Sequence, residues 1–206
     1  MVINITLAEN SNQRFAAHQL VKETYLRKFS VNIDELHYLH PEQFDCDTLL
    51  AYSGESNEVL GTMSIMYPNQ SGIFPCESLF GFNLSLYNFA KNKYVEIGRF
   101  ATSEKAKRNP AVVISLFLGA IRHLQIRQIN GWTATVKNDV FDFLRKIALP
   151  LHRIEQFPVL REEDPLNTYV GERSNLHLFD VSLEATVFSF QRFEGYLKKE
   201  LVKILF

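Results

Sequence analysis

Apolar residues recur along the chain with two spacings. Short runs rich in β-branched and aromatic residues predict strands, and longer stretches with apolar residues three or four positions apart predict helices. The predicted strands are Val2–Leu7, Thr48–Ser53, Val59–Tyr67, a core strand that begins at Lys93, Trp132–Val136, Leu151–Ile154 and Leu176–Val181. The predicted helices run from Ser11 or Asn12 to about Phe29, from Glu77 to Ala90, from Pro110 to Gln128, from Asn138 to about Ile147, and over about 183–205.

Turn residues between these elements predict how neighbouring strands pair. Gly54–Asn57 separates two strands closely enough for a hairpin. Asn130 and Gly131 end the long helix, so the core strand, this helix and the next strand form a unit whose two strands should be parallel and frame a cleft. Residues 30–44 and 155–173 are expected to be irregular, and the first of these segments is a candidate substrate loop.

The core strand carries two charges where apolar residues are expected. Tyr94, Ile97 and Phe100 favour a strand, and Glu96 and Arg99 interrupt its apolar character. Charges at such a place indicate a functional site. The alternatives are a solvated edge strand, or an ion pair between the two charges that only holds neighbouring elements together.

The loop after this strand is basic and leads into a helix. Asn109 is a good N-cap and Pro110 suits the first helical position. The free N–H groups of the first turn, with Lys105, Lys107 and Arg108 alongside, could hold a phosphate. The alternative is a capped surface helix whose preceding loop is basic by chance.

Composition excludes several classes of protein. The chain has 206 residues, 46% of them hydrophobic and 22% charged, which fits one domain over residues 1–206. A net charge of −1 gives no general footprint for nucleic acid or a membrane surface. The N-terminal residues do not have the form of an export signal, and no stretch reaches the roughly 18 apolar residues of a membrane span, so a cytoplasmic protein is expected.

No metal or disulfide site is predicted. Cys46 and Cys76 lie far apart and outside any CxxC pattern, which favours small buried hydrophobic side chains. A metal site can be drawn from His37 and His40 with the nearby Asp45, but histidines of a surface loop are the commoner interpretation. Hydrolase, nucleoside triphosphatase and dinucleotide-binding motifs are absent from the sequence.

Three short motifs resemble those of a known enzyme family. Glu96–Phe100 is similar to a Glu-x-x-Arg-Phe motif, Glu42–Asp45 to an acidic Asp-x-x-Asp motif, and Gly61–Thr62 to a strand-centre motif. With the order of elements, they resemble the Gcn5-related N-acetyltransferase (GNAT) superfamily over roughly residues 15–155. Within it, the chain resembles the branch of acyl-homoserine-lactone (autoinducer) synthases and long-chain N-acyl amino acid synthases. The resemblance implies an α/β (α+β) fold with a central mixed sheet and helices on both faces.

The resemblance also implies roles for individual residues. Glu96 would act as general base, Glu42 and Asp45 would bind the amine substrate, and Arg99 would order the acidic cluster. A phosphopantetheine thioester, either acyl carrier protein or acyl-CoA, would be the co-substrate, with no tightly bound cofactor. The residues expected to contact its pantetheine arm and phosphate are Phe100, Ala101, Thr102, Arg108 and Asn109.

Departures from the family pattern carry further expectations. Ser64 stands where the lactone synthases usually have arginine, which argues against S-adenosylmethionine as substrate, and Phe141 stands where many relatives have a general-acid tyrosine. Without that tyrosine, the thiolate would be protonated by water or not at all. The absence of glycine from residues 104–109 favours a carrier-bound donor, which presents one phosphodiester, over free coenzyme A. The expected docking residues for an acidic carrier protein are Lys91, Lys93, Lys105 and Lys107.

These expectations lead to one function and one alternative. The first is an acyltransferase that moves a fatty acyl group from a carrier thioester to the amine of a small amino compound. The alternative is a non-catalytic GNAT-fold protein that binds a ligand or a partner, because a shared fold does not establish a shared activity.

Overall fold

The computed structural model describes residues 2–35, 44–84, 93–106, 109–164, 166–172, 175–195, 199 and 201–206. The strands are β1 (Ile3–Leu7), β2 (Cys46–Ser53), β3 (Val59–Met66), β4 (Tyr94–Thr102), β5 (Gly131–Lys137), β6 (His152–Ile154), β7 (Leu176–Ser182) and β8 (Val202–Ile204). The α-helices are α1 (Ser11–Phe29), α2 (Pro75–Phe80), α3 (Pro110–Ile126), α4 (Asn138–Lys146), α5 (Leu166–Val170) and α6 (Leu183–Phe190). Single 3-10 turns are formed by Ile33–Glu35, Glu104–Ala106 and Gln191–Phe193.

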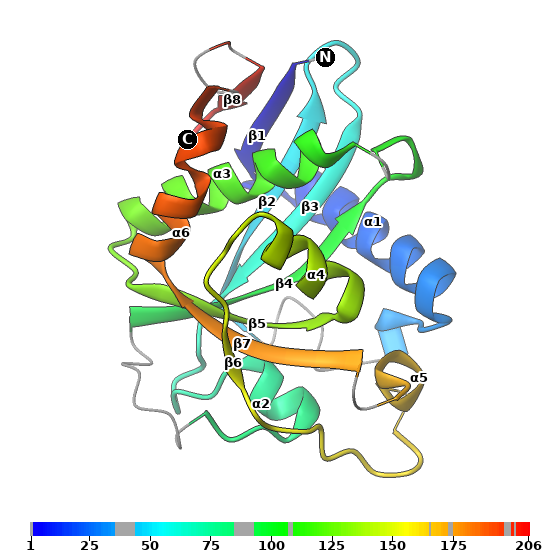
Figure 1. Ribbon diagram of the computed structural model, residues 1–206. Helices are drawn as coiled ribbons and strands as arrows, with labels where there is room; N and C mark the ends of the chain where they lie inside the picture. Colours follow the sequence, from blue (N-terminus) through cyan, green and yellow to red (C-terminus); the bar gives the residue numbers. More distant parts are fainter. Residues whose placement is uncertain are drawn as a thin grey trace.

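The described strands join into one mixed sheet of eight strands in the order β6-β7-β5-β4-β3-β2-β1-β8 (Figure 1). β4 and β5 are parallel, as are β1 and β8, and the other neighbours are antiparallel. α3, α4 and α6 cover one face, and α1, α2 and α5 cover the other. The predicted fold class, a mixed sheet with helices on both faces, is confirmed.

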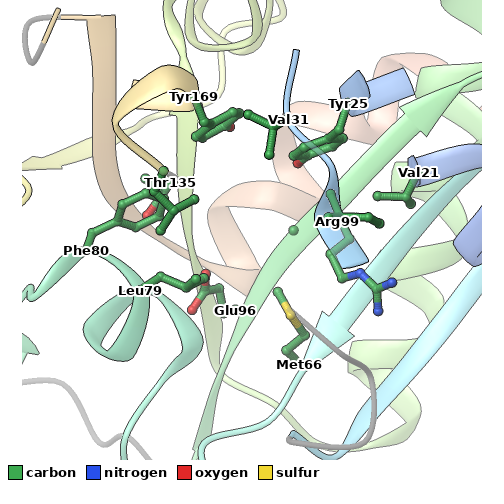
Figure 2. Close-up of a pocket in the computed structure, with 13 residues that line it drawn as sticks. Val21, Tyr25, Val31, Met66, Leu79, Phe80, Glu96, Arg99, Thr135 and Tyr169 are labelled. Atoms are coloured by element: carbon green, nitrogen blue, oxygen red, sulfur yellow. The ribbon is translucent and has the colours of Figure 1, made fainter. Parts of the chain in front are cut away.

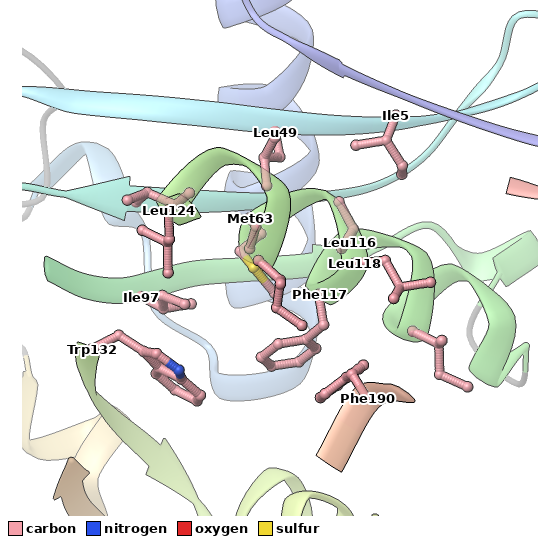
Figure 3. Packing of buried hydrophobic residues seen from close by; sticks show 14 of the residues in the cluster. Ile5, Leu49, Met63, Ile97, Leu116, Phe117, Leu118, Leu124, Trp132 and Phe190 are labelled. Carbon is pink, nitrogen blue, oxygen red and sulfur yellow. The ribbon is translucent and has the colours of Figure 1, made fainter. Parts of the chain in front are cut away.

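The largest hydrophobic core lies between α3 and the sheet (Figure 3). Phe117 of α3 packs against Trp132 of β5 and Phe190 of α6, with ring centroids 5.9 and 5.4 Å apart. The indole N–H of Trp132 donates to the hydroxyl of Thr186 at 2.9 Å, so its polar group is satisfied although the ring is buried. Each buried aromatic or aliphatic side chain of this kind stabilises the fold by about 1.5–3 kcal/mol. The position of β5 relative to α3 is therefore firmly fixed.

Helix starts follow from local capping groups. The side chain of Asn109 accepts a hydrogen bond from the N–H of Ala111 at 3.0 Å, and Pro110 occupies the first turn, as predicted. α1 starts as expected at Ser11, but its cap is Asn10, which forms a capping box with Gln13.

Two predicted helices were wrong in their extent. The helix expected over Glu77–Ala90 ends at Phe80, because Gly81 adopts φ +67° and terminates it; residues 85–92 lie outside the described part. The helix expected over about 183–205 ends at Phe190, and the chain closes in β8, which pairs with β1. In β8, apolar residues two positions apart follow the strand period, and the pairing covers the edge of β1.

A smaller correction concerns the segment expected to be irregular before β7. It contains the short helix α5, which packs Leu166 and Val170 into a second hydrophobic core beneath α2. None of the helices built from the described residues combines the length and apolar character that crossing a bilayer requires.

Candidate active site

β4 and β5 separate after a short parallel pairing. Tyr94–Glu96 pairs with Gly131–Thr133, and the described residues of the two strands do not pair beyond this point. β4 stays paired with β3 as far as Thr102. The opening between β4 and β5 is a cavity of about 290 Å³, here named the interstrand cleft.

The interstrand cleft is largely apolar. Its apolar walls come from β3, β4, β5, α3 and α4 and include Met63, Phe100, Val113, Phe117, Trp132, Val140, Phe143 and Leu144. Its polar groups include the hydroxyl of Thr135, which is buried and has no hydrogen-bond partner among the described residues. Charged side chains, Lys28, Arg99, Lys137 and Asp139, also line the cleft. Apolar walls with polar groups at defined points suit a ligand that combines an apolar chain with polar atoms.

A β-bulge interrupts β4 beside Gly98. Ser64 pairs with Gly98 and Thr62 pairs with Ala101, so β4 has one residue more than β3 in this interval. Within it Arg99 has φ +49°, in the left-handed region that non-glycine residues rarely adopt. The extra residue shifts the alternation of β4, so that the Arg99 side chain lies on the face covered by α1.

Glu96 lies on this same face, almost completely buried, with 4% of its surface exposed. Its carboxylate accepts a hydrogen bond from the N–H of Cys76 at 2.8 Å, at the start of α2. Burial raises the pKa of Glu96 to about 7; contacts with Cys76 act against this rise, and the charge of Glu77 adds to it. A carboxylate with this pKa can take up and release a proton near neutral pH.

Arg99 is held by an ordered chain of polar side chains. One guanidinium N–H donates to Nδ1 of His18 at 3.0 Å, and Nε2 of His18 lies 2.9 Å from Asp34, which also pairs with Lys22. Because a guanidinium only donates, His18 must accept at Nδ1 and donate from Nε2. The Nε of Arg99 is buried and has no hydrogen-bond partner among the described residues.

Arg99 and Glu96 do not form an ion pair among the described residues. Figure 2 shows the guanidinium pointing away from the carboxylate, toward α1. Arg99 is also not among the groups that shift the pKa of Glu96. The alternative of an ion pair between the two charges that only holds neighbouring elements together was therefore wrong.

Two further cavities adjoin the interstrand cleft. A small cavity of about 50 Å³ is lined by Glu96, Arg99, Tyr25, Thr135 and Tyr169, among others (Figure 2). A larger one of about 700 Å³, here named the α1 cavity, lies between α1 and the start of β2 and is also lined by Arg99. Arg99 thus lines all three cavities.

Of the other site residues predicted from the sequence, only some line these cavities. Asp45 lines the α1 cavity with Arg99, and Phe100 and Thr102 line the interstrand cleft. Ala101 instead packs its side chain against α1, which leaves only its backbone for a ligand. Asn109 caps α3, so its amide oxygen is already engaged.

The predicted basic loop carries less free charge than expected. Lys105 donates to Glu58 at 2.9 Å, and Glu104 of the same loop pairs with Arg27 at 2.7 Å. Lys93 is exposed. Lys91, Lys107 and Arg108 lie outside the described residues, as do Glu42, His37 and His40.

A separate polar cluster fixes the start of β2. Asp47 accepts from the hydroxyl of Tyr67 at 2.8 Å and lies 2.8 Å from Nε2 of His123 at the end of α3. The hydrogen bond with His123 is the main reason that the pKa of Asp47 is lowered. The cluster lies on the α3 face of the sheet, and its effect on the site is to hold the start of β2, which Asp45 directly precedes.

Comparison with known families gives this geometry a context. Residues 15–156 match the family model described as N-acyl amino acid synthase FeeM. The chain belongs to the FeeM family of N-acyl amino acid synthases. The match includes the bulged strand β4 with Glu96 and Arg99, and the residues that line the interstrand cleft apart from Tyr169. No curated protein sequence matches the chain.

Solved structures similar to this FeeM-family chain share its fold. FeeM, an N-acyl amino acid synthase from uncultured soil microbes, superposes with a TM-score of 0.68 at 18% identity, over 94% of this chain and 97% of that one. BjaI, a CoA-dependent acyl-homoserine lactone synthase, gives 0.59 at 13% identity, over 99% and 93%. A GNAT-family acetyltransferase from Staphylococcus aureus Mu50 gives 0.56 at 11% identity, over 88% and 99%.

The sequence analysis of this FeeM-family chain missed several residues of the site. Tyr25 and His18 of α1, Thr135 of β5 and Tyr169 of α5 all contact the cavities around Glu96 or hold Arg99. One signal was present in the sequence. His18 and Tyr25 are seven positions apart, so they lie on one face of α1, and this face must cover the sheet. No local pattern points to Tyr169, which reaches the site only through the packing of α5.

Proposed function

We propose that this protein transfers a long-chain acyl group from a phosphopantetheine thioester to the amino group of an α-amino acid by direct attack. The observation that carries the proposal is that a buried carboxylate, Glu96, and a buried guanidinium, Arg99, line one small cavity on the same face of β4, beside an apolar cleft that Arg99 also lines. Membership of the N-acyl amino acid synthase family supports the same reaction.

Glu96 is the general base of this proposal. An amine is mostly protonated at neutral pH and must lose a proton before its nitrogen can attack a thioester carbonyl. A carboxylate with its pKa raised to about 7 is better matched to that task than an ordinary glutamate. The base works directly or through one water molecule in the small cavity.

Arg99 supplies the contact that distinguishes an amino acid from a simple amine. Its Nε is buried without a partner, and a guanidinium binds carboxylates in a planar, two-pronged geometry. In an α-amino acid the amine and the carboxylate are attached to one carbon atom. An acceptor held by its carboxylate at Arg99 would therefore bring its amine close to the Glu96 side of the same small cavity.

The interstrand cleft is the proposed place of the thioester arm and acyl chain. Unpaired backbone groups of β4 beyond Glu96 can meet the amides of a pantetheine arm, and the apolar walls suit an alkyl chain. We favour acyl carrier protein as donor, because residues 104–109 contain no glycine to bring backbone close to a pyrophosphate. Acyl-CoA is the competing donor, and BjaI, which shares the fold, is CoA-dependent.

The test is an assay of the purified protein with a long-chain acyl donor and a mixture of amino acids. Mass spectrometry should find N-acyl amino acids and free thiol in equal amounts, and Glu96→Gln should abolish most of both. Saturable binding of the donor without consumption of the thioester would contradict the proposal and would favour the non-catalytic binding protein.

A further inference from the structure

Two tyrosines from distant parts of the chain meet beside Glu96. Tyr25 of α1 and Tyr169 of α5 stack with ring centroids 5.6 Å apart and an interplanar angle of 12°. Both line the small cavity that holds Glu96 and also the interstrand cleft. Figure 2 shows them on the same side of the small cavity, across from the carboxylate.

The proposed reaction requires a proton donor for the departing sulfur. When the C–S bond of a thioester breaks, the electron pair stays on sulfur, and a thiolate in an apolar cleft is costly unless it is protonated or receives a hydrogen bond. α4 offers no such donor at Phe141, whose ring stacks on His177 at 4.2 Å. Among the described residues, the hydroxyls that line both the cleft and the small cavity belong to Tyr25, Tyr169 and Thr135.

The surroundings of the two tyrosines affect their pKa values differently. Burial raises the pKa of Tyr25, but the charge of Arg99 and the interaction with the Tyr169 hydroxyl both act to lower it. For Tyr169, burial and the neighbouring Tyr25 both raise the pKa. A phenolate would therefore form more readily on Tyr25, where Arg99 and the Tyr169 hydroxyl stabilise it.

We propose that Tyr25 donates its hydroxyl proton to the sulfur of the departing thiol, with Tyr169 holding its ring and its oxygen in place. The proposal rests on the proposed function. Glu96 first takes the proton of the ammonium group and releases it to solvent. As the neutral amine then attacks, Glu96 takes the second proton from nitrogen; as the C–S bond breaks, sulfur takes the proton of Tyr25. The proton on Glu96 then returns to the Tyr25 oxygen through a water in the shared cavity, so that amide and thiol are formed and both residues are restored.

The experiment compares two acyl donors that differ only in the leaving group. The first is an acyl thioester of pantetheine, whose alkyl thiolate needs a proton to depart well. The second is the matching S-phenyl thioester, whose thiophenolate is a much better leaving group. Rates are measured for the wild type, for Tyr25→Phe, and for Tyr169→Phe as the matched control, with uncatalysed aminolysis subtracted.

Tyr25→Phe should lose about 10²-fold in kcat with the pantetheine thioester and less than about 5-fold with the S-phenyl thioester, as expected for loss of a general acid. Tyr169→Phe should lose far less with the first donor, because it removes only a supporting contact. An equal loss with both donors, or no loss with either, would overturn the role of Tyr25. A wild type that consumes neither donor would instead overturn the proposed function, and Glu96→Gln should slow both donors alike.

Discussion

Glu96 and Arg99 lie on the same face of the sheet although they are three positions apart along β4. A regular strand would place them on opposite faces, because side chains alternate with a period of two. The bulge beside Gly98, with Arg99 at φ +49°, brings both side chains to the same face of the sheet. A carboxylate and a guanidinium are thus brought to one cavity, while their heads point apart and each keeps its own partners.

The buried state of Glu96 predicts how stability depends on pH. Its pKa is about 7 in the folded protein and 4.5 in the reference state, so the folded protein binds more protons between these values. The free energy of unfolding therefore falls as pH rises from about 4.5 to about 7, by about 3 kcal/mol from this group. Chemical denaturation of wild type and Glu96→Gln across this range should show the variant becoming relatively more stable. A constant difference between the two proteins would mean that the carboxylate titrates normally.

Turnover should depend on the same ionisation of Glu96, but it should rise with pH where the free energy of unfolding falls. A base works only when it is deprotonated, so turnover should increase with pH through about 7 and then level off. In Glu96→Gln the rate should be lower by about 10²-fold or more, and the rise near pH 7 should disappear. A variant that keeps wild-type turnover would exclude Glu96 as base.

His18 is expected to position Arg99 rather than to react. Loss of a hydrogen bond to a charged group costs about 1.5–3 kcal/mol, so His18→Ala should raise the KM for the amino acid about 10-fold or more with little change in kcat. Lys22→Ala is the matched control, since it removes another partner of Asp34 without touching the guanidinium. Similar effects of both variants, or an effect mainly on kcat, would argue against this role.

Asp45 is expected to attract the ammonium group of the incoming acceptor. It lines the α1 cavity together with Arg99, so its charge faces the amino acid acceptor and not the acyl donor. Asp45→Asn should raise the KM of the acceptor more than that of the donor. If both KM values rise equally, the residue serves the structure of the strand start instead.

Docking of an acidic carrier protein should depend on the exposed lysines that precede and follow β4. Lys93→Glu and Lys105→Glu should lower kcat/KM for the acylated carrier about 10-fold at low salt, with little effect on acyl-CoA, and the difference should shrink as ionic strength rises. Lys199→Glu, on the β8 side of the sheet, makes the same charge change elsewhere and serves as the control. Equal use of acyl-CoA, without a salt effect on either donor, would refute the carrier as preferred donor.

The fold and the carboxylate of the site could be predicted from the sequence, because strong local signals specify them. Asn109 and Pro110 mark the start of α3, and a charge within an apolar strand marks Glu96. The direction of Arg99 could not be predicted, since a bulge with a positive φ at a non-glycine residue leaves no local signature. The same holds for the meeting of Tyr25 with Tyr169, which depends on how α1 and α5 pack.

The most direct test of the account is the ratio of kcat/KM for an amino acid to that for the amine lacking its carboxyl group. Burial of a guanidinium that has no carboxylate partner and whose Nε makes no hydrogen bond among the described residues is costly, so the wild type should favour the amino acid by about 10²-fold or more. Arg99→Gln should reduce this preference to within about 10-fold while the variant still folds. A wild type that acylates both compounds equally, or an Arg99→Gln variant that keeps the full preference, would contradict the assignment of Arg99 to the carboxylate and with it the amino acid as acceptor.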